Sequence, residues 1–265
     1  MIKKYTLLAL VFSLIIICTG SPKAQNQQNL KELLQQGDKL AEKQFDNNGA
    51  LDKYMAADKI NPGNWEIYWR ISRSYVDIAD ELPASSDIQK AERQAEYQAA
   101  FDYADKAVRL APDKSVTYLR RAIANGKIAL FKGIFSVIGI VNRVKEDAET
   151  ALKLGNGDSH VQAVSHYVLG RTHLKVCEKP YLVRLPLGLG WGDLDKAESE
   201  LKTAVEIKPN FRMFYLELAK LYIENDEYQK AKENLNKLER SPKANQDDDK
   251  FLAEGRTLIE KIKDK

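Results

Sequence analysis

The stretch FRMFYLELAKLYIENDEYQKAKENLNKLERSP, residues 211–242, decides the fold of this 265-residue chain. Its second half places Ala231, Leu235 and Leu238 at four- and then three-residue spacing, and it ends at Ser241-Pro242. That spacing puts the three side chains on one face of a helix. The proline then ends the helix, because it cannot donate the next backbone hydrogen bond. Since the first half also carries an apolar stripe, residues 211–242 predict two helices packed face to face.

The same pattern occurs four more times along the chain. In each case small and apolar residues recur at four- and three-residue spacing, at Ala50/Tyr54/Ala57, Ala100/Ala104/Ala107, Val144/Ala148/Ala151 and Ala197/Leu201/Ala204. The segments stop at Asn61-Pro62, Ala111-Pro112, Gly155-Asn156-Gly157 and Lys208-Pro209. A partner segment with its own apolar stripe precedes every later instance, at 64–79, 115–131 and 160–176. Pairs of this kind bury their apolar faces only by stacking, so the sequence predicts an all-α solenoid.

This pattern resembles the tetratricopeptide repeat, which has a small residue midway in its first helix and Ala…Phe…Ala…Pro in its second. Ala122, Gly170 and Ala219 fill the first small position, and Ser72 departs from it mildly. The resemblance implies a right-handed solenoid of about five helical hairpins and a C-terminal capping helix. The expected boundaries are 30–62, 64–112, 115–156, 160–209 and 211–242 for the repeats and 247–263 for the capping helix.

Three of the repeats are longer than the period of about 34 residues that this family shows. Both halves of the pattern survive in each, so the extra residues must lie between the two helices of a pair. They correspond approximately to 79–96, 129–143 and 176–192. Because all three occur at the same turn, we expect them to project from one edge of the solenoid.

The third insertion identifies a branch of the family. The stretch CEKPYLVRLPLGLGWGDLDKAESELKTAVEIKPN, residues 177–210, resembles the regulator of microtubule dynamics proteins, as do AVRLAP at 107–112 and HYVLGR at 166–171. In eukaryotes that family is associated with microtubules and membrane contact sites. The resemblance covers roughly residues 60–240 and leaves out the N-terminus.

The first twenty residues differ from the rest. Lys3 and Lys4 precede an apolar run from Leu7 to Ile17, and small or polar residues follow. This order predicts a signal peptide at 1–20, a polar linker at 21–29 and a repeat domain at 30–265, hence export to the periplasm or cell envelope. An uncleaved anchor is the alternative. Cys18 is a second alternative, as a candidate lipidation site. The residue before a lipidated cysteine should be small, and the large Ile17 therefore argues against lipidation.

Charge and motifs argue against several function classes. The 41 basic and 38 acidic residues are mixed along the chain, which disfavours nucleic acid as a partner. The stretch LGLGWGD lacks the spacing of a phosphate-binding loop, and it predicts a turn with Asp193 as the N-cap of the next helix. His173 and Cys177 lie one helical turn apart, but two ligands do not hold a structural zinc. We therefore expect that the protein is not an enzyme, and that it has no metal, no cofactor and no catalytic residue.

The first helices of the pairs are expected to line a concave groove. At one equivalent position lie Trp69, Leu119, Tyr167 and Leu216, and one turn later lie Arg73, Ile123, Arg171 and Lys220. The candidate ligand or peptide groove is therefore Trp69, Arg73, Tyr167, Arg171, Leu216 and Lys220. Arginines there can hold a carboxylate by forked hydrogen bonds. Structural roles for Trp69 and Tyr167 remain open, because large aromatic residues also build cores.

Two functions follow from these features. The first is a scaffold of the cell envelope that binds a protein or peptide partner in the groove. The second is a carrier for a lipid or another hydrophobic molecule, suggested by the apolar segment IALFKGIFSVIGIV at 128–141, which can also be core or contact a membrane surface. A role like that of the microtubule regulators is implied only by the family resemblance.

Overall fold

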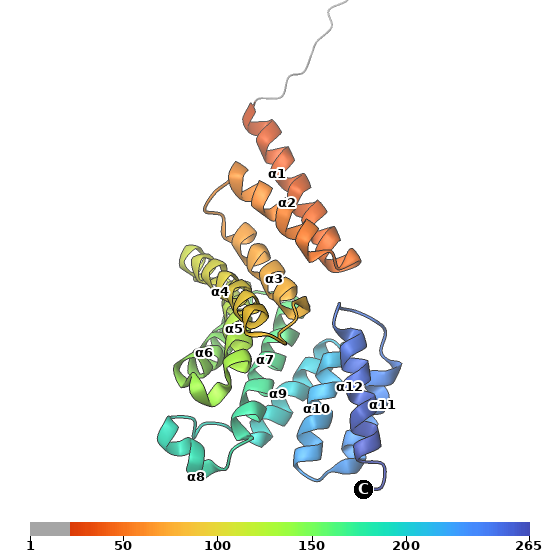
Figure 1. The fold of residues 1–265 in the computed structure, drawn as a ribbon. Coiled ribbons are helices and arrows are strands. Elements are labelled where there is room, and N and C mark those ends of the chain that lie inside the picture. Colours follow the sequence, from red (N-terminus) through yellow and green to blue (C-terminus); the bar gives the residue numbers. More distant parts are fainter. Residues whose placement is uncertain (1–21) are drawn as a thin grey trace, which may run out of the picture.

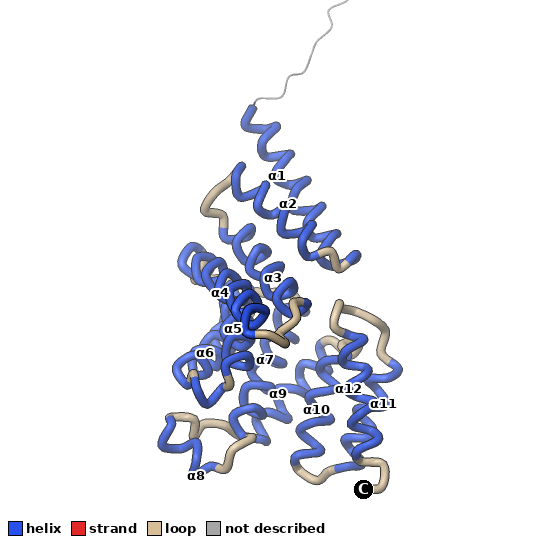
Figure 2. The backbone as a smooth tube through the Cα atoms, viewed as in Figure 1, coloured by secondary structure: helices blue, strands red, loops and turns tan. Residues whose placement is uncertain are grey.

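The computed structural model describes residues 22–265, and within this range the chain is helix or loop throughout (Figures 1 and 2). The predicted all-α solenoid of helix pairs is confirmed. The α-helices are α1 Pro22–Lys39, α2 Asn47–Ile60, α3 Trp65–Glu81, α4 Asp87–Leu110, α5 Ser115–Lys132, α6 Ile138–Leu154, α7 Ser159–Cys177, α8 Tyr181–Arg184, α9 Leu194–Ile207, α10 Arg212–Glu224, α11 Tyr228–Arg240 and α12 Asp248–Lys261. Short π- and 3-10 helices lie at Leu40–Gln44 (η1), Ile134–Ser136 (η2) and Leu185–Leu187 (η3).

The helices pack as sequential pairs. The partners are α1 with α2, α3 with α4, α5 with α6, α7 with α9, and α10 with α11, while α12 covers the last pair. Helix α1 begins at Pro22, so residues 22–29, expected to be a polar linker, are helical. The expected signal peptide and Cys18 lie outside the described residues. Among the helices of residues 22–265, none has the length and apolar composition needed to cross a membrane.

Small residues allow the paired helices to approach closely. Ala100, Ala104 and Ala107 of α4 are fully buried, and so are their counterparts in α2, α6 and α9. Gly170 has no room for a side chain, because a Cβ there would lie 2.9 Å from Cγ of Leu201 on α9. These positions explain why the spacing of alanines in the sequence predicted the pairing.

Side-chain caps begin several helices where the sequence turns polar. Ser86 forms a capping box with Gln89 at the start of α4, and Asp158 accepts from the backbone N–H of Val161 at the start of α7. Asp193 accepts from the backbone N–H of Lys196 at 2.9 Å. The interpretation of LGLGWGD as a turn ending in an N-cap is confirmed.

The three insertions form a secondary apolar region beside the solenoid. The first two mainly lengthen α3 to α6, and the third forms α8, η3 and the glycine-rich turn after them. Ala79, Tyr97 and Ile128 bury one apolar cluster between the first and second insertions. Ile134, Val176 and Leu189 bury another between the second and third. The insertions therefore pack in succession against one another.

Candidate functional site

The inner surface of the solenoid forms a partly open cavity of about 950 Å³. Helices α3, α5 and α7, the first helices of three consecutive pairs, line it together with η1, the N-terminal part of α10 and the segment 244–247 before α12. Each of the three helices contributes a stripe of residues at helical spacing, such as Val116, Arg120, Ile123 and Lys127 on α5. Val141 and Val144 of α6, the second helix of the third pair, also line the cavity.

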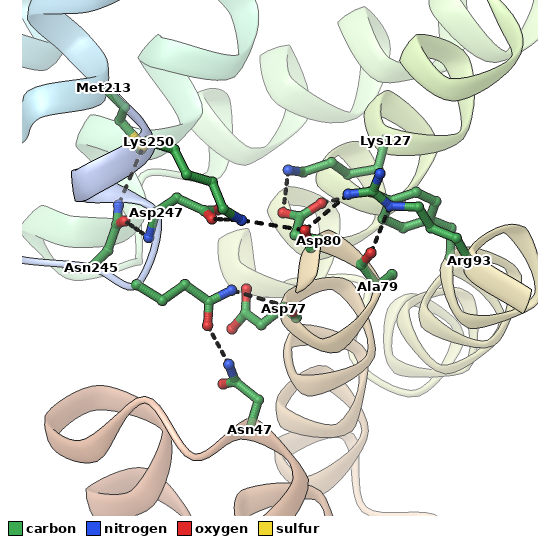
Figure 3. A network of polar contacts seen from close by, with 12 residues as sticks. Asn47, Asp77, Ala79, Asp80, Arg93, Lys127, Met213, Asn245, Asp247 and Lys250 are labelled. Atoms are coloured by element: carbon green, nitrogen blue, oxygen red, sulfur yellow. Dashed lines mark hydrogen bonds and ion pairs between the residues drawn. The ribbon is translucent and has the colours of Figure 1, made fainter. Parts of the chain in front are cut away.

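The cavity is closed by contacts between residues far apart in the chain. Gln246, in the loop before α12, accepts a hydrogen bond from Asn47 Nδ2 at the start of α2 and donates to the Asp77 carbonyl of α3 at 3.1 Å. Lys250 of α12 donates to the Asp80 carbonyl at 3.4 Å (Figure 3). These donors, together with Arg93 of α4, satisfy carbonyls near the C-terminal end of α3, where positive groups are favoured. The C-terminal segment thus bounds one side of the groove.

Trp69 lies in the cavity wall with three guanidinium groups around its ring. The carbon Cζ lies 4.3 Å from the ring centroid for Arg70, 5.5 Å for Arg73 and 5.3 Å for Arg120. Arg70 and Arg73 are neutralised by this chain, because Arg70 pairs with Asp38 at 2.9 Å and Arg73 with Glu42 at 2.7 Å. The aromatic ring and the two ion pairs therefore form a fixed platform.

Arg120 differs from the other two arginines. Among residues 22–265 it has no hydrogen-bond or ion-pair partner within bonding distance, and its Nε is buried and unbonded. Burial, and then the positive charge of Arg73, lower the pKa of Arg120 from 12.5 to about 10. A largely buried cation without a hydrogen-bonded partner is costly, and an anion bound directly to the guanidinium would offset that cost.

Two titratable groups share this part of the cavity with Arg120. Burial raises the pKa of Asp77 to about 6, although Arg73 and Arg120 act in the opposite direction. Burial and the charge of Arg120 lower the pKa of His160 to about 4, so its imidazole is neutral at pH 7. At pH 7 the Asp77 carboxyl is therefore largely ionised, and its charge partly offsets those of Arg73 and Arg120 without a hydrogen bond to either.

A second polar group lies on α7 and α10. Arg171 donates to the Tyr167 hydroxyl at 3.1 Å and pairs with Glu217 at 3.5 Å. Lys220 pairs with the same Glu217 at 3.2 Å and with Glu254 at 2.9 Å. Burial alone would raise the pKa of Glu217, but Arg171 and Lys220 hold it below its usual value. This cluster joins α7, α10 and α12 and leaves little free positive charge.

The six predicted groove residues divide into two groups. Trp69, Arg73, Tyr167 and Arg171 line the cavity, whereas Leu216 and Lys220 are not part of its lining. Leu216 is 1% exposed and belongs to the C-terminal core. At the start of α10 the cavity residues are Phe211, which precedes the helix, and Met213, because only this end of α10 reaches the cavity. Leu119, the expected equivalent of Trp69 in the third pair, is likewise fully buried.

Arg120, His160 and Phe45 are cavity residues that sequence reasoning missed. Arg120 is one position after Leu119, which the sequence pattern predicts to lie in the groove. Aligning α5 with the other first helices one residue later would have identified Arg120 as the groove residue. Phe45 follows the π-helical turn η1 with φ 56°, a left-handed conformation that a bulky side chain rarely adopts. Such strain costs on the order of 1–3 kcal/mol and is found preferentially at functional sites.

The far end of the cavity is apolar. Ile134 and Val141, both buried members of the segment 128–141, line it together with Val164, Val168 and Val176. The segment is therefore partly core and partly cavity wall. An occupant would meet both cationic and aliphatic side chains in the cavity wall.

The remaining histidines have structural partners. His166 Nδ1 lies 2.5 Å from Glu200 of α9, and the buried ring of His173 packs edge-on against Trp191 at 5.2 Å. Burial raises the pKa of the Cys177 thiol. His173 and Cys177 thus pack at the base of the third insertion.

Comparison with known proteins agrees with this architecture. A family model described as "Regulator of microtubule dynamics protein 1-3" matches residues 33–263. The chain belongs to this family. The match extends beyond the residues 60–240 that carried the resemblance, and includes η1 and all of α12.

Solved structures show that this member of the regulator of microtubule dynamics family has a tetratricopeptide-type fold. The thermophilic tetratricopeptide protein TTC0263 of Thermus thermophilus aligns with a TM-score of 0.60 and 19% identity, over 87% of this chain and 98% of that one. The pilF protein of Pseudomonas aeruginosa aligns with a TM-score of 0.52 and 12% identity, over 90% and 93%. No curated protein sequence matches the chain.

Proposed function

We propose that this protein is a non-enzymatic binding protein whose cavity takes the end of a partner polypeptide, with the terminal carboxylate at Arg120. The observation that carries the proposal is Arg120, which lies beside the Trp69 ring in the cavity and has no bonded partner among residues 22–265. A planar guanidinium binds a carboxylate through two parallel hydrogen bonds. Arg73 and Arg171, which already pair with Glu42 and Glu217, shape the site and do not supply its free charge.

The size of the cavity limits the occupant. Its volume of about 950 Å³ is at the upper end of the roughly 300–1,000 Å³ usual for small-ligand sites. A folded domain does not fit, but a few residues of extended chain do. Ile123, Val164 and Val168 would contact apolar side chains of that segment.

Short peptides with free C-terminal carboxylates test the proposal, with the matching carboxamides as controls. We expect the free acids to bind and to change Trp69 fluorescence, and Arg120→Met to abolish the preference for acid over amide. The matched control is Arg121→Met on the same helix, because Arg121 is held by Asp105 and Asp147 outside the cavity. Equal binding of acids and amides would contradict the carboxylate assignment.

A carrier of a lipid or another hydrophobic molecule is the second candidate. The aliphatic end of the cavity, at Ile134, Val141 and Val176, supports it. Native mass spectrometry of the purified protein distinguishes the candidates. A co-purifying apolar molecule favours the carrier, and an empty protein that binds peptide acids favours the polypeptide receptor.

We also propose that the protein works in the cell envelope after export, on the basis of the N-terminal pattern at residues 1–20. The mass of the mature protein tests this, because cleavage after Gly20, Ser21 or Ala24 and lipidation at Cys18 give different masses. A full-length product retained in the cytoplasm would contradict it. An exported protein would not meet tubulin, so we expect no co-sedimentation with microtubules.

A further inference from the structure

Five large apolar side chains are exposed together on the third insertion. They are Leu182 (81% exposed), Tyr181, Val183, Leu185 and Leu187, all on α8 and η3. We call these five residues the tip surface. Folded proteins rarely expose contiguous apolar side chains without a partner. The short helix α8 protrudes at the lower left of Figure 1, at the opposite end of the solenoid from the start of α1.

The tip surface is held in place by a buried arginine. Arg184 is 8% exposed, and its Nη1 donates to the carbonyls of Leu189 at 3.2 Å and Gly192 at 2.7 Å. Leu189 is fully buried and packs with Val176 and Ile134. The one charged side chain of residues 181–187 therefore points inward, and the apolar ones remain outside. The exposure results from a fixed loop structure.

The charge of the insertion is one-sided. Between Glu178 and Asp193 the chain carries Lys179 and Arg184 and no carboxylate. Lys179 is exposed immediately before α8. A protruding apolar surface beside a cation is suited to the interface of a bilayer that contains anionic lipids.

We propose that the tip surface is a membrane-docking site, which inserts its apolar side chains into the headgroup region of an anionic bilayer. A protein partner fits less well, because each side of a stable protein interface contributes roughly 20–30 residues and this surface has five. The inference is independent of the cavity and of its occupant. It adds a second, lipid-facing surface to the protein.

Bromine quenching of tryptophan fluorescence tests the proposal in the full chain. The probe is Leu182→Trp, with vesicles of phosphatidylcholine and phosphatidylglycerol that carry bromine on their acyl chains. The matched control is Ile88→Trp, because Ile88 is 75% exposed but stands at the start of α4. Since the native tryptophans are present in both variants and in the parent, the added signal isolates each position.

We expect quenching of the tryptophan at 182 and none at 88. Leu182→Asp should lower vesicle partitioning about tenfold or more relative to Ile88→Asp, because it replaces a leucine that inserts into the bilayer with a charged side chain. Circular dichroism checks that both variants are folded. Bound protein with no quenching at 182 would assign the binding to another segment, such as the N-terminus, and would overturn the proposal. Absence of vesicle binding, or self-association through residue 182 in sedimentation, would overturn it as well.

Discussion

Two adjacent arginines of α5 should respond in opposite ways to the same substitution. Among residues 22–265 Arg120 faces the cavity without a bonded partner, whereas Arg121 donates to Asp105 at 2.8 Å and to both oxygens of Asp147 at 2.7 and 2.9 Å. We expect Arg120→Met to stabilise the protein and Arg121→Met to destabilise it. Methionine keeps most of the side-chain volume and removes the charge in both cases.

The magnitudes follow from the surroundings of each group. The pKa of Arg120 falls from 12.5 to about 10, and one pKa unit corresponds to about 1.4 kcal/mol, so its charge costs about 3 kcal/mol in the cavity. The Trp69 ring returns about 1–2 kcal/mol of that through its contact with the guanidinium. Arg120→Met should therefore raise the free energy of unfolding by about 1–2 kcal/mol. Arg121→Met leaves Asp147, whose side chain is 5% exposed, without its partner and should cost about 3 kcal/mol.

Urea unfolding followed by circular dichroism measures both changes under one set of conditions. The difference in sign is the informative result, because it does not depend on the absolute values. If Arg120→Met lowered stability as much as Arg121→Met, Arg120 would have a protein partner. The argument that it is reserved for an anionic occupant would then fail.

Three further predictions concern titration, packing and closure. The folded state raises the pKa of Asp77 from 3.8 to about 6, so the folded protein holds that proton more tightly and loses stability as pH rises through this window. Asp77→Asn should therefore nearly match the wild type near pH 4 and exceed it by about 3 kcal/mol at pH 7 in urea unfolding. A pH-independent difference would contradict this. A Cβ at residue 192 would lie 2.5 Å from Val176 Cγ1 and 2.8 Å from Arg184 Nη1. Gly192→Ala should therefore lower the free energy of unfolding by about 2 kcal/mol, measured by thermal unfolding. Gly139→Ala is the control, because Gly139 has open space around it, and this change should be neutral or stabilising. Gln246→Ala should lower the global free energy of unfolding by only about 1 kcal/mol. It should increase amide hydrogen exchange in residues 243–250 and at the start of α2. Unchanged exchange would show that the contacts of Gln246 with Asn47 and Asp77 do not hold this side of the cavity together.

The fold was predictable because its determinants are local. The spacing of Ala100, Ala104 and Ala107 follows from helix geometry, and a proline at Pro112 ends the segment whatever the rest of the chain does. The same is true of Asp193, since a cap needs only its own first turn. Family membership was visible in residues 177–210 for a similar reason, because the third insertion has a distinctive sequence.

The site was predictable only in part, because it depends on helix rotation and on long-range closure. Trp69, Arg73, Tyr167 and Arg171 line the cavity, but a rotation of about one residue on α5 exchanges Leu119 for Arg120. The contact of Gln246 with Asn47 spans 199 residues, and no local pattern indicates it. Whether a cation is free also depends on partners in other helices, as Glu217 of α10 shows for Arg171 of α7.

The most direct test of the account is calorimetric titration of the protein with short apolar peptides that end in a free carboxylate, alongside the same peptides as carboxamides. We predict that the acids bind at least about tenfold more tightly than the amides, as expected for a charge-assisted, forked contact. We also predict that Arg120→Met removes this difference while Arg121→Met retains it. Acids and amides that bind equally, or a preference that survives Arg120→Met, would contradict the assignment of the cavity as a carboxylate receptor.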